Sequence, residues 1–513
     1  MRGFSRLSSW RRPAARPARP PILRPAADTF SRKGRRIALG LLAAACLAYP
    51  AAAETLRLTG VLTGADHQTY RELPFRVPAG TTSVTVEFAY TGKEQKSVID
   101  LGIRDPQRFR GWSGGNKSRF TLTETWATPS YLPGPLPAGE WRLILGVPNL
   151  RRDARAEYAA TVTLEAGGAF HGFAEAPLKT GPGWYRGDLH VHTGHSDGGC
   201  ASQNGKRVPC PLHRSLEAAA ARGLDFVVVS EHNTTSHHQA LAELQGFFDD
   251  LLLIPGREIT TFQGHLNVFG VTAPLDFQLG SERAPDLSRI LDQVEAAGGL
   301  AVINHPNLPS GEVCMGCGWT ARTDFARIAA IEAVNGAISS GPLSGVGFWE
   351  KQLGEGRRIT AVGGSDNHDP TLSGNRAVGV PTTVVHADNL SHDAILAGLR
   401  GGHVFIDVEG TKDRLLEITA RANGRSARMG DALATEAGDL VRLKVRVAGA
   451  AGGRLVIRSS DPRFAPPDPI AVETDDAALD IAFGVDGRRG WVRAEVQGPD
   501  GRPWLIGNPI HFD

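Results

Sequence analysis

The feature that most constrains the fold of this chain is a series of short apolar segments, each followed by His, Asp or Glu. Segments such as 226–229 and 301–303 have the length and branched side chains of buried strands in α/β proteins. Side chains just beyond such strands gather at one end of the fold, where α/β barrels build their sites. The series runs from Gly187 to Pro370. The sequence therefore predicts one site assembled by several strand ends.

The residues of this series are of the types that bind divalent metal ions. In a strand, His190 and His192 point to the same face, and the same spacing relates Asp366 and His368. A mixture of imidazole and carboxylate suits zinc, manganese or iron, whereas calcium and magnesium prefer oxygen ligands. Core histidines and helix-capping acids are the alternative, but ionisable groups are rarely buried unless paired or metal-bound. The candidate ligands are His190, His192, Asp197, His232, Glu258, His265, His305, Asp366 and His368.

Eight short motifs follow one another along the chain, and seven of them carry these ligands. They are 185–193 (YRGDLHVHT), 196–198 (SDG), 223–225 (GLD), 230–233 (SEHN), 255–260 (PGREIT), 264–265 (GH), 304–306 (NHP) and 364–368 (GSDNH). Together they resemble the polymerase and histidinol phosphatase (PHP) superfamily of metallohydrolases, and more closely its CehA/McbA-type branch. The resemblance covers residues 183–408. It implies a distorted seven-stranded (β/α) barrel, two or three divalent ions (Mn, Zn or Fe) and phosphoester hydrolysis. Glu231 departs from the pattern, because many relatives carry Asp there.

The resemblance also implies a role for each candidate ligand. A first ion would be held by His190, His192 and Asp366, and Glu258 would bridge it to a second ion completed by His265 and His305. A third group, made of Asp197, His232 and His368, would bind another ion or line the substrate pocket. A metal-bound hydroxide would then be the nucleophile, because coordination lowers the pKa of water toward neutrality. No serine or cysteine nucleophile is required.

Three further residues are candidates for contact with a substrate. Arg257, beside Glu258, and Arg376, in the loop 373–376, could neutralise a phosphate ester. A structural role is the alternative for each arginine. His195 lies between two ligand motifs and could donate a proton to the leaving group, or be a solvated loop histidine.

Three functions remain open from the sequence. The favoured one is an exported metal-dependent phosphoesterase that acts on a small phosphomonoester or phosphodiester. The same centre could instead hydrolyse a carbamate, amide or ester. A non-catalytic exported binding protein is the third possibility, and the intact ligand series argues against it.

The first 53 residues have the composition of a secretory signal. Residues 1–36 are rich in Arg and Pro, residues 37–48 are apolar, and small residues precede Glu54. The apolar segment is too short for a permanent membrane anchor. Twin-arginine export at Arg35 and Arg36 and lipidation of Cys46 are alternatives. We therefore expect a periplasmic or secreted protein with no stable membrane span.

Removal of this segment changes the charge of the protein. The whole chain has a formal net charge of +2, and residues 1–53 carry 11 Arg and Lys and one acid. That segment accounts for +10, so the remainder carries −8. An acidic protein of this kind is not expected to bind nucleic acid through a basic surface.

Four cysteines follow Cys46 and fall in two short Gly-containing segments. An oxidising compartment would favour disulfides, and local pairs of Cys200 with Cys210 and of Cys314 with Cys317 are preferred. Cross-pairing remains open, as does a structural zinc site if the protein is cytosolic.

The rest of the chain predicts domains on both sides of the ligand-bearing region. Residues 54–165 alternate apolar and polar types, as in an antiparallel β-sandwich, and residues 166–182 form a linker. Residues 183–410 form the α/β barrel, with helices at 216–222, 287–297 and 392–400, and residues 411–513 form a smaller β-sandwich. The first sandwich could contact carbohydrate through Trp112, Trp126 and Trp141. Burial of these rings in the core is the favoured alternative.

Overall fold

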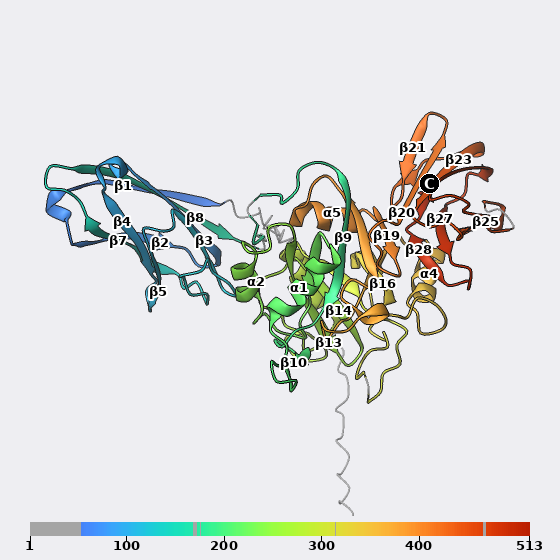
Figure 1. Ribbon diagram of the computed structural model, residues 1–513, viewed down its shortest axis with the longest axis horizontal. Helices are drawn as coiled ribbons and strands as arrows, with labels where there is room; N and C mark the ends of the chain where they lie inside the picture. Colours follow the sequence, from blue (N-terminus) through green and yellow to red (C-terminus); the bar gives the residue numbers. More distant parts are fainter. Residues whose placement is uncertain (1–52, 168–171, 175, 313, 465–467) are drawn as a thin grey trace, which may run out of the picture. The chain divides into compact units, whose positions relative to one another are not determined.

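The computed structural model describes residues 53–167, 172–174, 176–312, 314–464 and 468–513 (Figure 1). These residues form a mixed α/β structure that is rich in strands, with one large mixed sheet and several antiparallel sheets. The predicted signal segment lies outside the described residues except for residue 53, and so does part of the predicted linker. In the portion that the structure describes, no helix combines the length and apolar character needed to span a bilayer.

The N-terminal part consists of two four-stranded antiparallel sheets, with orders β1-β8-β3-β6 and β2-β7-β4-β5. Its elements are β1 (Glu54–Thr63), η1 (Gly64–Asp66), β2 (Tyr70–Val77), β3 (Thr81–Tyr90), η2 (Lys93–Gln95), β4 (Val98–Arg104), β5 (Phe109–Gly114), β6 (Arg119–Thr123), β7 (Gly139–Asn149) and β8 (Arg155–Ala166). Alternate side chains such as Val84, Val86 and Leu143 form one buried core. Trp141 is fully buried in this core, and Trp126 is also buried but packs outside it, against Phe173. The carbohydrate contact stays a prediction.

The middle part carries the ligand motifs on a succession of strands and helices. Its elements are β9 (Gly183–Val191), β10 (Gly199–Ala201), β11 (Arg207–Pro209), α1 (Leu212–Arg222), β12 (Phe226–Val229), α2 (His238–Leu244), β13 (Leu252–Thr261), β14 (Gly264–Phe269), α3 (Leu287–Ala296), β15 (Leu300–Ile303), η3 (Phe325–Arg327), β16 (Ala330–Asn335), α4 (Val346–Gly354), β17 (Thr360–Gly364), η4 (Gly374–Arg376), β18 (Thr382–Ala387), α5 (His392–Arg400) and β19 (Val404–Asp407). The three predicted helices are confirmed as α1, α3 and α5. Asp286 and Ser391 accept hydrogen bonds from backbone N–H groups and cap α3 and α5.

The strands of the middle part pair in the order β17-β16-β15-β14-β13-β12-β9-β18-β19. Most neighbours from β9 to β17 are parallel, but β14 is antiparallel to both β13 and β15. A parallel bridge between Val191 and Asn367 brings the segment after β17 beside β9, and His192 N donates to Asn367 O at 2.9 Å. The first and last ligand motifs therefore meet. The α/β class is confirmed, while the seven-stranded barrel remains an expectation of the resemblance.

The C-terminal part continues the same sheet. Its elements are β20 (Leu415–Ala422), β21 (Arg425–Arg428), β22 (Ala432–Leu433), β23 (Ala437–Ala448), β24 (Arg454–Ser459), η5 (Pro462–Phe464), β25 (Ile470–Ala471), β26 (Asp476–Asp486), β27 (Gly490–Gln497), β28 (Pro503–Gly507) and β29 (Ile510–Phe512). Strand β28 pairs with β19 and leads to β27, β24 and β25, while β21, β20, β23 and β26 form a second antiparallel sheet. Side chains of both sheets share one core, to which Ile418 and Val445 belong.

The two cysteine pairs lie close in sequence and in space. Cys200 and Cys210 are at disulfide distance across the β10–β11 hairpin. Cys314 and Cys317 are at disulfide distance in the segment after β15. The local pairing predicted from the sequence is thus the arrangement in the structure.

Candidate metal centre

The structure gathers all nine candidate ligands at one place, from six strands or the segments that follow them. His190 lies in β9 and Glu258 in β13, whereas His305 follows β15 and Asp366 follows β17. The side-chain ligand atoms fall into compact sets, with the atoms of each set within 4.8 Å of one another. These sets are His190, His192 and Asp366; His190, Glu258 and His305; and His192, Asp197, His232 and His368. Residues up to 178 positions apart in the chain therefore share one centre.

Glu258 lies in the middle of this centre. Its carboxylate faces histidines from four segments, at distances of 3.5 Å to His190 Nε2, 3.6 Å to His192 Nε2, 2.8 Å to His232 Nδ1, 3.3 Å to His265 Nδ1 and 3.3 Å to His305 Nε2. The side chain of Glu258 is only 1% exposed. Asn304 Nδ2 also donates to Glu258 Oε1 at 2.8 Å. A carboxylate with both oxygens directed at several imidazoles has the geometry of a bridging ligand.

Asp366 belongs to the same set as His190, in β9, and His192, directly after β9. Its Oδ1 lies 3.3 Å from His190 Nε2 and 3.2 Å from His192 Nε2. Both imidazoles are fully buried. The two rings approach one carboxylate oxygen from the same face of the strand, as the period of two predicted.

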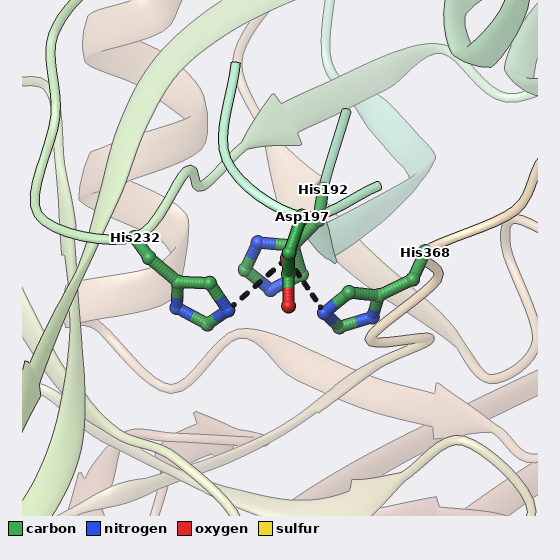
Figure 2. Close-up of side chains that lie close together, drawn as sticks. All are labelled: His192, Asp197, His232 and His368. Atoms are coloured by element: carbon green, nitrogen blue, oxygen red, sulfur yellow. Dashed lines mark ion pairs between the residues drawn. The ribbon is translucent and has the colours of Figure 1, made fainter. Parts of the chain in front are cut away.

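A third set lies nearer to solvent (Figure 2). Figure 2 shows the Asp197 carboxylate between the rings of His232 and His368, with Oδ1 at 3.4 Å and 3.2 Å from their Nε2 atoms. The ring of His192 stacks on each of these histidines at a centroid distance of 4.3 Å. The side chain of Asp197 is 59% exposed. This set therefore connects the buried part of the centre to the surface.

The acidic and basic groups alter one another's pKa. Burial by itself would raise the pKa of Glu258, but the interactions with His190 and its neighbours hold that pKa well below its usual value. Burial would lower the pKa of His190, but the negative charges of Asp366, Glu332 and Glu258 raise it well above its usual value. Burial would also lower the pKa of His232, but its interactions with the Asp197 and Glu258 carboxylates outweigh burial and raise this pKa to about 10. The carboxylates are therefore ionised and attract positive charge.

Several buried ring nitrogens of this centre lack a hydrogen-bond partner among the described residues. They are His190 Nε2, His192 Nδ1, His192 Nε2 and His305 Nδ1. A buried polar atom without a partner is destabilising, and it calls for an unseen partner or ion. A donor set of imidazole nitrogens and carboxylate oxygens fits divalent cations such as zinc, manganese or iron. The residues present therefore fit the metal centre that the sequence predicts.

Glu332, in β16, is a buried acid of this site that the sequence reasoning missed. Its Oε1 accepts a hydrogen bond from His190 Nδ1 at 2.9 Å, and its Oε2 accepts one from the backbone N–H of His305, also at 2.9 Å. Hydrogen bonds of this kind fix the ring orientation of a metal-binding histidine. Nε2 of His190 is thereby directed at Asp366 and Glu258. An acid inside the apolar run 330–334 was the signal in the sequence.

Two other buried acids support the segments that carry ligands. Asp188 accepts hydrogen bonds from the backbone N–H groups of His190, Ser365 and Gly379, and so ties β9 to the last motif. Glu231 accepts a hydrogen bond from Thr193 N at 3.2 Å and others from the hydroxyls of Thr193 and Ser196. The longer side chain at position 231 therefore holds the loop that presents Asp197.

The three further candidates from the sequence do not hydrogen-bond any of the nine ligands in the part of the chain described. Arg257 is buried, its Nη2 donates to Ala273 O at 2.7 Å, and burial lowers its pKa to about 10. Arg257 precedes Glu258 in β13 and so points to the opposite face of the sheet. The side chain of Arg376 is exposed, and its backbone O accepts from Asn367 Nδ2. His195 Nδ1 lies 2.9 Å from Ser236 Oγ.

Comparison with known proteins adds little to this geometry. No protein-family model matches the chain, and no curated protein matches it. One similar solved structure is a two-domain protein from Bacteroides vulgatus ATCC 8482 that contains a predicted PHP-like metal-dependent phosphoesterase. The similarity covers 64% of this chain and 95% of that chain, with 20% sequence identity and a TM-score of 0.38. At that level neither the fold nor the activity of this chain follows from the likeness.

Proposed function

We propose that this protein is a metal-dependent hydrolase with the PHP-type fold that its motifs resemble, and that its substrate is a small phosphate ester. The observation that carries the proposal is the position of Glu258. A buried, ionised carboxylate is surrounded by five imidazoles, several of whose nitrogens have no hydrogen-bond partner among the described residues. Several buried carboxylates and imidazoles gathered in this way destabilise the folded state unless cations neutralise the negative charge, because buried charges without partners are destabilising.

The residues of the centre would have different roles, as ligands of two ions, as supports of those ligands, or as contacts on the solvent side. His190, His192, Asp366 and Glu258 would hold one ion, and Glu258, His265 and His305 would hold a second. Ions held there supply a Lewis acid and lower the pKa of a coordinated water. Glu332 keeps His190 oriented, and Glu231 keeps the Asp197 loop in place. Asp197, His232 and His368 face the solvent side, where they would bind a third ion or contact the substrate.

Hydrolysis of a carbamate, amide or ester is the second candidate. The observation that favours it is the engagement of Arg257 with Ala273 O, on the face of β13 away from Glu258. A phosphate monoester carries more negative charge than a carbamate and gains more from an arginine close to the ions. Within the described residues, no arginine hydrogen-bonds or pairs with the nine ligands. A phosphodiester or an uncharged substrate carries less negative charge than a monoester and so depends less on such an arginine.

The experiment that separates these functions is a side-by-side assay. The purified, metal-loaded protein would be given p-nitrophenyl phosphate, bis-p-nitrophenyl phosphate and 1-naphthyl N-methylcarbamate. We expect hydrolysis of at least one phosphate ester that disappears with chelator and returns with manganese, zinc or iron. Faster cleavage of the carbamate than of both phosphate esters would replace the first proposal by the second. Lack of any metal-dependent hydrolysis would contradict both.

Export is a separate part of the proposal and rests on the composition of residues 1–53. The mature chain would begin near Glu54, where the described strand β1 starts. N-terminal sequencing of the protein from the exported fraction should find a start within a few residues of Glu54. A soluble cytosolic form that retains Met1 would contradict export without affecting the metal centre.

A further inference from the structure

A cysteine pair lies beside His265, one of the candidate ligands of the metal centre. Cys314 and Cys317 belong to the segment after β15, which packs on the turn between β13 and β14. Gly316, with φ of +86°, fits so closely that a Cβ there would lie 2.1 Å from Thr261 O. Gly264 lies equally close to Trp319, with its ideal Cβ position 2.3 Å from Trp319 Cε3. The backbone of the cysteine segment therefore fits closely against the turn that precedes His265.

His265 faces the metal centre with one ring nitrogen and the cysteine segment with the other. Its Nδ1 lies 3.3 Å from Glu258 Oε1, and its Nε2 lies 3.1 Å from Met315 O. A backbone carbonyl only accepts, so the ring must donate its Nε2–H to Met315. In the neutral ring the lone pair then resides on Nδ1, directed at the Glu258 side. The disulfide-bonded form thus presents His265 to the centre.

The same ring is also close to both sulfur atoms. One ligand atom each of His265, Cys314 and Cys317 lie within 4.8 Å of one another. Sulfur atoms joined in a disulfide are poor ligands, whereas two thiolates and an imidazole form a common zinc donor set. The other disulfide offers a contrast, because among the described residues Cys200 and Cys210 belong to no group of this kind.

We propose that Cys314, Cys317 and His265 form a second, thiolate-type metal site once the disulfide between these cysteines is reduced, and that His265 then no longer serves the Glu258 centre. The second half of this proposal rests on the proposed function, because it assumes that His265 Nδ1 binds an ion there. The site would take a thiophilic divalent cation such as zinc. Met315, between the two cysteines, is 72% exposed, so a water molecule could supply a fourth ligand to such an ion.

The chemistry of this change is balanced. A dithiol reductant donates two electrons and two protons, the bond between the two sulfur atoms breaks, and the reductant leaves as its own disulfide. The two thiols lose their protons when the cation binds. The proton of His265 moves from Nε2 to Nδ1, where it can be donated to Glu258 Oε1. Nε2 is then free to bind the new ion, so the same ring cannot serve both sites in this way.

Cobalt(II) is a suitable probe, because cobalt bound to thiolate has an intense sulfur-to-metal charge-transfer absorption in the near ultraviolet. Full-length protein would be reduced with a dithiol, freed of it under nitrogen and titrated with cobalt beside an untreated sample. We expect the absorption in the reduced sample alone. It should vanish in the C314S/C317S double variant and persist in the matched C200S/C210S double variant. The single variant H265A should bind cobalt at the thiolates at least tenfold more weakly.

Two results would overturn the site itself. One is a reduced wild-type protein that binds cobalt without the charge-transfer absorption. The other is an absorption that depends on Cys200 and Cys210 and survives in C314S/C317S. The first measurement needs no substitution, so a folding defect in a variant cannot obscure the answer.

The link to the Glu258 centre is tested on the same samples. Zinc bound per chain would be counted by elemental analysis before and after reduction, and hydrolysis of bis-p-nitrophenyl phosphate would be measured in parallel. We expect reduction to lower the turnover at least tenfold while zinc stays bound. Unchanged turnover after reduction, with the thiolate absorption present, would overturn the claim that His265 changes sites. No hydrolysis in either sample, with the absorption present, would refute the proposed function and leave the thiolate site standing.

Discussion

The two ends of the metal centre differ in how they are built. Glu258, at the inner end, is 1% exposed and lies in a strand among histidines from neighbouring strands. Asp197, at the outer end, is 59% exposed and lies in a loop held by Glu231. Buried ligands on strands are positioned rigidly, whereas a loop ligand near solvent can contact an incoming molecule. The inner end is therefore suited to hold ions tightly, and the outer end to meet the substrate.

The largest expected effect comes from Glu258→Gln. This substitution keeps the size of the side chain but removes the charge that faces five imidazoles. We expect the bound metal to fall by at least one ion per chain and turnover to fall roughly 1,000-fold or more, as for loss of a main electrostatic element of a site. Elemental analysis and the phosphate-ester assay measure both. Two ions retained at near-normal activity would contradict the bridging role.

Asp197→Asn should have a smaller and different effect. The inner end is untouched, so the ions held there should remain, while turnover falls about 10- to 100-fold through a weaker outer site. His232 and His368 would also lose the partner that raises the pKa of each. Metal content and kcat/KM of this variant, beside those of Glu258→Gln, sharpen the contrast. Equal loss of metal in the two variants would show that the two ends act as one unit.

Glu332→Gln tests whether the support of the inner end matters. Glutamate accepts one hydrogen bond with each of its two oxygens, from His190 Nδ1 and from the backbone N–H of His305. Glutamine has only one side-chain oxygen, so one of these two hydrogen bonds is lost. The loss of one such hydrogen bond should weaken metal binding about 10- to 100-fold, as is typical for partners of metal-binding histidines. Calorimetric titration with zinc or manganese measures the change. Unaltered affinity would mean that strand packing alone orients His190.

The smallest effect concerns a histidine outside the centre. His237 is fully buried and its Nε2 lies 3.0 Å from Gly256 O. Burial lowers the pKa of His237 to about 4, from 6.5 in the unfolded chain. As the pH falls below 6.5, the imidazole of His237 takes up a proton in the unfolded state before it does so in the folded state. The contribution of neutral His237 to the free energy of unfolding is therefore complete above pH 6.5 and is lost as the pH falls toward 4. It amounts to roughly 3 kcal/mol at most. In His237→Gln the melting temperature should fall less steeply between pH 6.5 and 4 than in the wild type, and an equal slope would contradict the assignment.

The same contrast explains what could be predicted from the sequence. Ligands of the inner and outer ends follow apolar runs within short motifs, so local patterns were enough to find all nine side chains that the structure brings together. Glu332 has no such motif and its partner His190 is 142 residues away. Its role depends on strand pairing across the sheet, which a local pattern does not specify. The continuation of the sheet from β19 into β28 depends on tertiary pairing in the same way.

Arg257 shows the opposite case, in which proximity in sequence was misleading. Its place beside Glu258 suggested a substrate contact, yet neighbouring residues of a strand face opposite sides. Arg257 and Glu258 are both buried in β13, so it is the period of two along a strand, and not a difference in burial, that separates the two side chains. The approach of Cys314 and Cys317 to His265 is different, because it joins a loop to a turn 50 residues earlier and was not predictable from local sequence.

We propose that the inner end holds two ions bridged by Glu258. The most direct test is anomalous X-ray diffraction from crystals of the protein loaded with zinc or manganese, with data collected on either side of the absorption edge of the metal. We expect at least two anomalous peaks, one beside His190, His192 and Asp366 and one beside His265 and His305, each within bonding distance of a Glu258 oxygen. A single peak, or peaks that leave Glu258 without a bonded ion, would contradict it.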